Sequence, residues 1–295
     1  PGRGPLRLIT SCCPWWPAYM EKFPPDFIDN FSTPKSPHAM VGALTKTYYA
    51  EKKGLDPKDI FMVSIMPCTA KKFEIQRSEE MSSSGQQDID ISLTTRELCR
   101  MIKSAGIDFR NLPDDEQVDS LLGAYTGAGT IFGATGGVME AALRTAHWSL
   151  TKERLLTMEL KEIRGLDGVK EATLKVAGKD VRVAVAHCMG NIEIVLDKVR
   201  AAREAGEETP YHFIEVMACR GGCVGGGGQP YGATDTIRRQ RAAGLYRDDE
   251  KSAQRCSHEN PMIQQLYAEF LGEPLGEKSH QLLHTGYYKR KPYKR

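Results

Sequence analysis

The stretch FIEVMACRGGC, residues 213–223, places a short β-strand pattern directly in front of two cysteines. Residues 60–68, IFMVSIMPC, repeat this order of an apolar, β-prone run followed by a cysteine. Ligands of open α/β sheets bind at the carboxyl ends of the strands. The two stretches therefore predict an α/β fold in which strand ends deliver Cys68, Cys219 and Cys223 to a site.

Helices and further strands are predicted around these stretches. Residues 155–163, 172–176 and 181–186 read as strands, and a turn at residues 178–180 joins the last two as an antiparallel edge. Residues 71–90 are polar and Ser-rich and are predicted to form an exposed loop. Helices are expected over residues 36–54, with Ser36 as the cap and Gly54 at the end, and over residues 95–102, 137–148, 191–205, 234–243 and 260–271.

Composition excludes several classes of protein. The 295 residues carry 40 Lys and Arg against 38 Asp and Glu, a net charge of +2, so nucleic acid is not an expected partner. No run of about 18 apolar residues occurs, which argues against a membrane span. Residues 1–10 lack the apolar stretch of a signal peptide, so the cytoplasm is the default location. The basic tail, residues 287–295, is interpreted as a solvated end.

The eight cysteines are too sparse for a disulfide scaffold, and their position beside Gly and Pro indicates metal ligation. Three groups stand out: TSCCP at residues 10–14, MPCTAK at residues 66–71 and MACRGGC at residues 217–223. Thiolates suit iron-sulfur clusters or zinc. Zinc is the less favoured alternative because its structural sites normally contain CxxC pairs, and a disulfide between the adjacent Cys12 and Cys13 would be strained.

The surroundings of the cysteines add to this interpretation. Of two adjacent cysteines, one can bind metal while the other stays free as a proton carrier. Glycines beside Cys219 and Cys223 leave room for a bulky inorganic group and offer amides to its sulfurs. The Gly-rich residues 123–136 lack a phosphate-binding motif and predict close backbone packing. Cys99, inside a predicted helix, is interpreted as a small buried apolar residue.

The motifs TSCCP, MPCTAKKFE and MACRGGCVGGGGQP resemble, in order, the three signature motifs of the FeFe (iron-only) hydrogenases. The resemblance continues through residues 31–37, 132–145 and 266–285 and covers essentially the whole chain. It implies two lobes, each built on a mainly parallel sheet flanked by helices, with a metal cluster held between them. Residues 1–230 would form the catalytic domain, of the large-subunit type. Residues 231–295 would form a small-subunit-like helical segment with the basic tail.

The resemblance also assigns roles to single residues. Four cysteines would hold a four-iron cubane, and Cys223 would bridge it to a di-iron subsite with carbon monoxide, cyanide and azadithiolate ligands; together these form the H-cluster. Cys12 would exchange protons with the azadithiolate amine, and the Ser32 hydroxyl would belong to the proton path. His38 stands where relatives often have Gln, and its role is open. The ligands of the cubane would be Cys13, Cys68, Cys219 and Cys223. Lys71 and Ser36 would contact cyanide. The cofactor pocket would also include Met66, Met217 and Gln229.

The implied reaction is the reversible reduction of protons to dihydrogen. Ferredoxin or another electron-transfer subunit would supply electrons, and maturation machinery would supply the di-iron subsite. The alternatives are a non-catalytic, hydrogenase-like iron-sulfur assembly factor and a hydrogen sensor. The intact Cys12-Cys13 pair with Lys71 favours the enzyme over the assembly factor. The usual mark of a sensor, a substitution at or around Cys12, is not present.

The chain departs from the family pattern in three places. The family normally has a segment before TSCCP with two carboxylates of the proton path, whereas eleven residues precede Cys12 here. A fragment is the favoured explanation, and a second polypeptide or a reduced form are the alternatives. No CxxCxxCxxxCP run is present, so accessory clusters are not expected. Arg220 replaces the Pro that is most frequent in the third motif, and this predicts tuning rather than loss of ligation.

Overall fold

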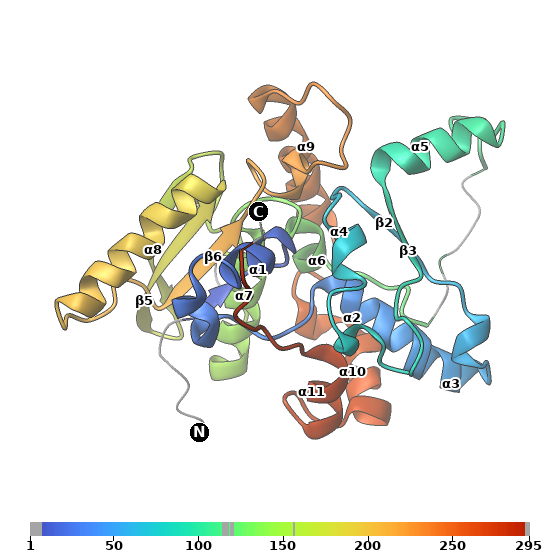
Figure 1. The fold of residues 1–295 in the computed structure, drawn as a ribbon, viewed down its shortest axis with the longest axis horizontal. Helices are drawn as coiled ribbons and strands as arrows, with labels where there is room; N and C mark the ends of the chain where they lie inside the picture. The colour runs from blue at the N-terminus through green and yellow to red at the C-terminus, as the bar shows by residue number, and fades with distance from the viewer. Residues whose placement is uncertain (1–7, 114–117, 119–120, 156, 293–295) are drawn as a thin grey trace.

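Two sheets lie on opposite sides of the molecule (Figure 1). The computed structural model describes residues 8–113, 118, 121–155 and 157–292. The larger sheet has the order β1 (Leu8–Thr10), β6 (Phe213–Met217), β5 (Lys179–His187) and β4 (Val169–Val176). Strands β1, β6 and β5 are parallel, and β4 is antiparallel to β5. The smaller sheet pairs β2 (Val63–Met66) with β3 (Ile91–Thr94) in parallel.

Helices cover both faces of the larger sheet. Ala184 and Ala186 of β5 face a core built with α1 (Trp15–Met20) and α8 (Met189–Glu204). Val183 and Val185 alternate with these alanines along β5. They face a second core, built with α7 (Gly137–Thr151). Successive side chains of a strand point to opposite faces, so an apolar run such as residues 183–186 fills both cores. The predicted α/β class, with mainly parallel sheets flanked by helices, is confirmed.

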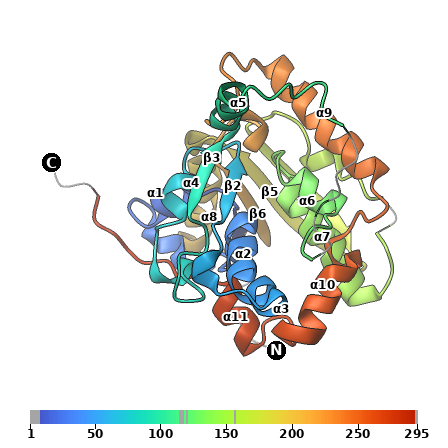
Figure 2. The same cartoon turned by 90° about the vertical axis from the view of Figure 1, so that its right-hand side faces the viewer.

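The other helices lie around the two sheets, with α9 at one end of the molecule and α10 and α11 at the other (Figure 2). A third core joins residues of the helix formed by α2 (Pro37–Leu44), a π-helical turn (Thr45–Tyr49) and α3 (Ala50–Lys53) to the C-terminal helices. The C-terminal helices are α10 (Pro261–Leu266), with its π-helical extension Tyr267–Leu271, and α11 (Glu277–Leu283). The remaining helices are α4 (Lys71–Glu74), α5 (Thr95–Ser104), α6 (Gly127–Ile131) and α9 (Asp235–Lys251).

Most predicted elements are present. The β4–β5 hairpin, the strand at residues 213–217 and the six helical regions are confirmed, and Gly54 ends its helix with a left-handed φ of 64°. The strand predicted over residues 155–163 is wrong: residue 156 lies outside the described residues, and the rest contains only the 3-10 turn Lys161–Ile163. Cys99 is exposed on α5, against the prediction of burial.

The polar stretch at residues 71–90 is an exposed loop only in part, because it begins with the helix α4 and alternates buried with exposed residues. Lys71, Glu74 and Arg77 are each 4–8% exposed, and Met81 is buried. Charged residues can be buried here because they are paired: Lys71 contacts Glu74, and Arg77 contacts Glu21, which directly follows α1. The polar pattern therefore reflects buried ion pairs at Lys71 and Arg77, and exposure to solvent at other positions such as Ser82 and Gln86.

The basic tail, as far as residue 292, packs onto the beginning of the chain. Tyr287 contacts the edge of the Phe31 ring at a centroid distance of 4.6 Å. Arg290 Nε lies 2.8 Å from Glu21 Oε2, and Arg77 Nη1 lies 3.3 Å from the other oxygen of Glu21. Figure 1 shows this segment passing beside α1. The interpretation of a solvated end is therefore wrong for Tyr287 and Arg290 but confirmed for residues 288, 289, 291 and 292, which are exposed; residues 293–295 lie outside the described part.

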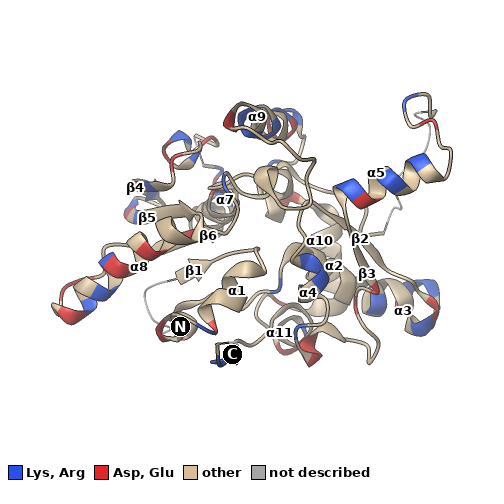
Figure 3. Cartoon of the chain, turned by 45° about the horizontal axis from the view of Figure 1, so that its top comes forward, with Lys and Arg blue, Asp and Glu red and all other residues tan. Residues whose placement is uncertain are grey.

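Positions of Lys or Arg and of Asp or Glu are mixed along the outer helices α3, α5, α8 and α9, whereas β1, β2 and β3 have none (Figure 3). This arrangement agrees with the near-zero net charge. Among the described residues, no helix is long and apolar enough to cross a membrane.

Candidate metal centre

Three strand ends deliver the three cysteine groups. β1 leads into Cys12 and Cys13, β2 into Cys68, and β6 into Cys219 and then Cys223. β1 and β6 are parallel neighbours, with Thr10 opposite Glu215, so their carboxyl ends lie side by side. β1 was not predicted from the sequence, and it adds a third case of a strand followed by cysteine. Parallel pairing therefore explains how cysteines from both ends of the chain meet.

The four predicted ligand thiols are close enough to influence one another's ionisation. Burial raises the pKa of Cys13 to about 12, and repulsion from Cys68, Cys219 and Cys223 adds to this rise. Burial, followed by Cys68 and Cys223, raises the pKa of Cys219 to about 11. The pKa of Cys223 is raised chiefly by a hydrogen bond with the Cys12 thiol and then by burial. The structure thus brings together four thiols and places the predicted proton carrier beside Cys223.

The local environment also favours metal-bound thiolates. The amide of Ala218 bonds to the Cys13 sulfur, and the amides of Ala70 and Lys71 bond to the Cys68 sulfur, each lowering the pKa of its thiol. Because burial keeps these thiols protonated at neutral pH without metal, metal binding would release protons. The set of donors therefore fits an iron-sulfur cluster.

These sulfurs are too far apart for a single metal ion. A tetrahedral zinc with Zn–S bonds of about 2.3 Å needs sulfurs about 3.8 Å apart. Within the part of the chain that the structure describes, no three of these sulfurs lie within 4.8 Å of one another. A cubane, with a different iron atom for each thiolate, fits the wider spacing. The geometry therefore disfavours the alternative of zinc.

Glycines hold the second and third cysteine loops against each other. Gly228 N donates to Pro67 O at 2.9 Å, and a Cβ at Gly228 would lie only 2.7 Å from the Cys68 amide nitrogen. Gly222, with φ of 88°, packs in the same way against Thr135 N, in the Gly-rich loop before α7. The space beside the cysteines that was predicted for an inorganic group is therefore occupied, at these two glycines, by backbone.

Only some of the residues predicted to line the cofactor pocket lie beside the cysteines. Met217 is 1% exposed and belongs to a small core with Cys13 and Val138. Met66, at the end of β2, is half-buried. Gln229 is half-buried and lines a cavity together with Cys223. Ser32 is half-buried, with its amide donating to Ile9 O at 2.8 Å, and it does not line the cavity beside Cys12.

Lys71 and Ser36 meet at a carboxylate that the sequence analysis did not single out. Lys71 Nζ and Ser36 Oγ each lie 2.8 Å from Glu74 Oε2, and His38 Nε2 contacts the same oxygen. Ser36 occupies the cap position of α2, but its side chain caps nothing there, contrary to prediction. Lys71 Nζ also donates to Cys12 O at 3.1 Å. Two signals in the sequence pointed to Glu74: it is the last residue of the motif MPCTAKKFE, and it follows Lys71 by three positions.

Two further features border the cysteines. Arg220 makes a two-pronged contact with Asp235, at 2.8 and 2.6 Å, which ties the third cysteine loop to the start of α9. Cys188, at a left-handed φ of 68°, follows β5 and donates its amide to Met217 O at 2.9 Å. The Cys188 thiol is near enough to contribute to the raised pKa of Cys219. The sequence analysis missed this sixth thiol, beside the four predicted ligands and Cys12.

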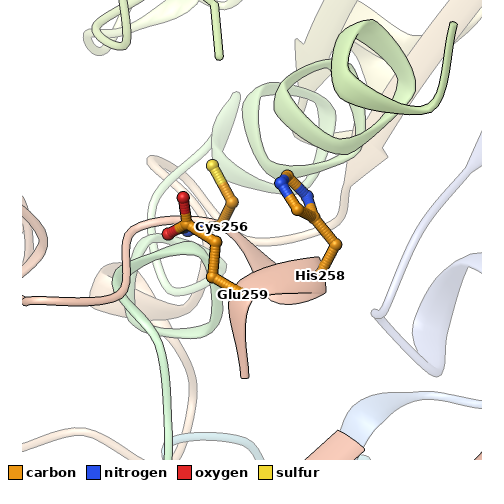
Figure 4. A group of neighbouring side chains, drawn as sticks. All are labelled: Cys256, His258 and Glu259. Carbon is orange, nitrogen blue, oxygen red and sulfur yellow. Dashed lines mark hydrogen bonds between the residues drawn. The ribbon is translucent and has the colours of Figure 1, made fainter. Parts of the chain in front are cut away.

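A separate group of possible ligands lies between α9 and α10. Cys256, His258 and Glu259 each place one ligand atom within 4.8 Å of the others (Figure 4). The Glu259 carboxylate accepts hydrogen bonds from the amides of Arg255 and Cys256 at 3.0 and 3.1 Å, and Arg154 donates to its other oxygen at 2.6 Å. Since these bonds already use the carboxylate, the group is explained as part of the turn Ser257–Glu259.

Cysteines at strand ends, too widely spaced for one ion, place this α/β chain in the class of iron-sulfur proteins. The chain belongs to the iron-only hydrogenase family. The family described as "Iron only hydrogenase large subunit, C-terminal domain" matches residues 2–227, and "Iron hydrogenase small subunit" matches residues 235–290. The recognition made from the three motifs is confirmed.

Several known proteins are similar over nearly the whole chain. The NADP-reducing hydrogenase subunit HndD of Solidesulfovibrio fructosivorans is 49% identical over 97% of this chain and 48% of its own. Iron hydrogenase 1 of Clostridium pasteurianum is 45% identical over 97% of this chain and 50% of its own. The chain therefore spans about half the length of these curated relatives.

A solved structure and a second group of relatives complete the comparison. A variant of the FeFe-hydrogenase HydA1 from Chlamydomonas reinhardtii superposes with a TM-score of 0.82 at 42% identity, covering 98% of this chain and 78% of the other. The cytosolic Fe-S cluster assembly factor narfl of Xenopus tropicalis is 32% identical over 96% of this chain and 59% of its own. Hydrogenases and an assembly factor thus both resemble it.

Proposed function

We propose that this chain is the catalytic domain of an FeFe hydrogenase, which reversibly reduces protons to dihydrogen. One observation carries the proposal: three strand ends bring four thiols close enough to affect one another's pKa, and the Cys12 thiol is near enough to raise the pKa of Cys223. Cys13, Cys68, Cys219 and Cys223 would hold the cubane of the H-cluster. Cys223 would share its sulfur with the di-iron subsite, next to Cys12.

When bound, the H-cluster would supply the iron chemistry that interconverts protons, electrons and dihydrogen. The chain's own residues would move protons and shape the pocket. Cys12 lines a cavity of about 10 Å³, room for roughly one water, through which it could pass a proton. Lys71 would donate a hydrogen bond to a cyanide ligand. Met217 would provide an apolar, polarizable wall.

Partners follow from this chemistry. An electron carrier of the ferredoxin type, or another subunit, would deliver electrons, and maturation machinery would insert the di-iron subsite. The Ser32 hydroxyl, Met66, Ser36 and Gln229 keep their predicted roles as proposals. The cytoplasmic location and the boundary between residues 230 and 231 also stay predictions.

A non-catalytic iron-sulfur assembly factor is the second candidate, because such proteins are about one-third identical over nearly all of this chain. The position of Cys12 favours the enzyme. Cys12 lines a cavity and is near enough to raise the pKa of Cys223, which suits a proton carrier. A protein that only carries a cluster needs no such thiol.

Infrared spectroscopy tests the proposal. Anaerobically purified protein, matured with the di-iron cofactor, should show carbon monoxide and cyanide bands that shift under hydrogen. Iron and sulfide without such bands, in folded protein and alongside a working maturation control, would overturn the proposal in favour of the assembly factor.

A further inference from the structure

A buried carboxylate beside the cysteine motifs has no role in the family resemblance described above. Glu74 ends the short helix α4, which starts at Lys71 directly after the Cys68 loop. Its side chain is 10% exposed, and its Oε2 atom contacts three other side chains. His38, whose role the resemblance leaves open, is one of the three.

Glu74 directs the Lys71 ammonium. Lys71 is 4% exposed, and two of its hydrogen-bond acceptors are Glu74 Oε2 at 2.8 Å and Cys12 O at 3.1 Å. An ammonium has three N–H donors. Two are therefore fixed between the first and second cysteine motifs, and the third remains to meet an acceptor at the cluster site.

Charge explains why a carboxylate is needed at this position. A buried ammonium is strongly destabilised when its partner is removed. Burial raises the pKa of Glu74, but Lys71 and His38 outweigh burial and lower the pKa to about 2. Burial also lowers the pKa of His38, so the ring is neutral near pH 7. The group formed by Lys71, Glu74 and His38 is therefore neutral overall.

We propose that Glu74 and His38 are positioning residues for Lys71. Glu74 holds the ammonium against the first cysteine motif, and His38 fixes the Glu74 carboxylate by donating a hydrogen bond from Nε2. Ser36 supplies a second neutral donor to the same oxygen. This role rests on the proposed function, in which Lys71 contacts the di-iron subsite. A Gln in place of His38, as relatives often have, would offer the same kind of donor through its amide.

A double-mutant cycle tests the role of Glu74. Glu74→Gln should shift the cyanide bands of the matured protein and lower hydrogen evolution roughly 10–100-fold, because a small displacement of a positioned group has effects of that size. In the Lys71→Met background the same substitution should add little, since Glu74 acts through Lys71. Equal losses in both backgrounds would overturn the positioning role. Lys72→Met, which changes the exposed neighbouring lysine, is the control and should leave the bands in place.

Two substitutions of His38 test its part. His38→Leu removes the donor and should shift the cyanide bands in the same direction as Glu74→Gln. His38→Gln keeps a neutral donor and should restore the wild-type bands and pH profile. If His38→Gln behaves like His38→Leu, a donor role for the ring is refuted.

A measurement without cofactor separates this inference from the proposed function. In cluster-free protein, Glu74→Gln should lower the melting temperature by roughly 5–10 °C, because Lys71 is left unpaired. Adding Lys71→Met should recover part of that loss. No loss in Glu74→Gln would overturn the inference. Wild-type protein that lacks carbon monoxide and cyanide bands would instead contradict the proposed function, whatever the melting temperatures show.

Discussion

Gly228→Ala should loosen the candidate cluster site through contacts between two loops. A Cβ at residue 228 would lie 2.7 Å from both the Cys68 amide nitrogen and the Pro67 carbonyl carbon, whereas ordinary contacts begin at 3.4 Å. The loops would have to separate by 3.4 − 2.7, or about 0.7 Å. Because the opposing atoms are backbone, no side chain can rotate away. Overpacking of this kind costs about 1–3 kcal/mol.

If that strain falls on the cluster-bound state, cluster binding weakens roughly 5–150-fold. Iron and acid-labile sulfide per chain, measured after reconstitution at limiting iron, are the readout. Gly227→Ala is the matched control, because its Cβ would first meet Thr69 Oγ1 at 3.3 Å, the end of a side chain that can turn. We expect reduced iron in Gly228→Ala and wild-type iron in Gly227→Ala. Equal iron in the two variants would refute the idea that backbone contact holds these loops in register.

Three further predictions concern catalysis, stability and pH. Cys12→Ala should keep its cluster but lose most hydrogen evolution; unchanged evolution would contradict the proton-carrier role. Arg144→Met should cost about 3–5 kcal/mol in urea unfolding of the cluster-free protein, because it leaves Asp249, which Arg144 contacts at 2.8 Å through both oxygens, buried without that partner. The exposed Arg154→Met should cost less than about 1 kcal/mol, and equal costs would count against the burial argument. Because the pKa of Glu74 falls from 4.5 to about 2 on folding, the stability it contributes is complete above pH 4.5 and is lost as the pH drops toward 2. The stability gap between wild type and Glu74→Gln should therefore shrink across that window, and a constant gap would show that the pKa is not depressed.

Strands that consist of a continuous run of apolar, β-prone residues could be predicted from the sequence. β6 and the core of β5 are apolar runs and were found. β1 was missed because it has three residues and exists through pairing with β6, with Leu8 opposite Phe213. The apolar residues at 155–163 misled the prediction because Leu160 and Ile163 are buried in the α7 core without joining a sheet. A short strand such as β1 forms only because another strand pairs with it, and the local sequence does not show which segment that partner is.

In the candidate site, the cysteines could be predicted from the sequence, whereas the buried hydrogen bonds among the neighbouring residues could not. Glu74 lies in a polar stretch that resembles a solvated loop, and its partners Ser36 and His38 come from a distant helix. Ser36 has the position of a helix cap, yet its hydroxyl bonds to a charged carboxylate, which is the stronger acceptor. The residue types that can bind a metal are visible in a short motif. The hydrogen bonds that orient the residues around them join segments distant in sequence, so they depend on tertiary structure.

The pairing of β1 with β6 has a consequence for the whole chain. It brings together Cys13 and Cys219, which are 219 − 13, or 206, positions apart in sequence. A metal group bonded to both would close a loop that contains most of the protein, and a cross-link over more than 100 residues restricts the unfolded chain by roughly 4–5 kcal/mol. The proposed cluster would then stabilise the fold as a cross-link, in addition to being the reaction centre. Oxidative loss of iron should accordingly lower the stability of the whole chain, including the turn of the β4–β5 hairpin at Ala177 and Gly178, at the opposite end of β5 from Cys188.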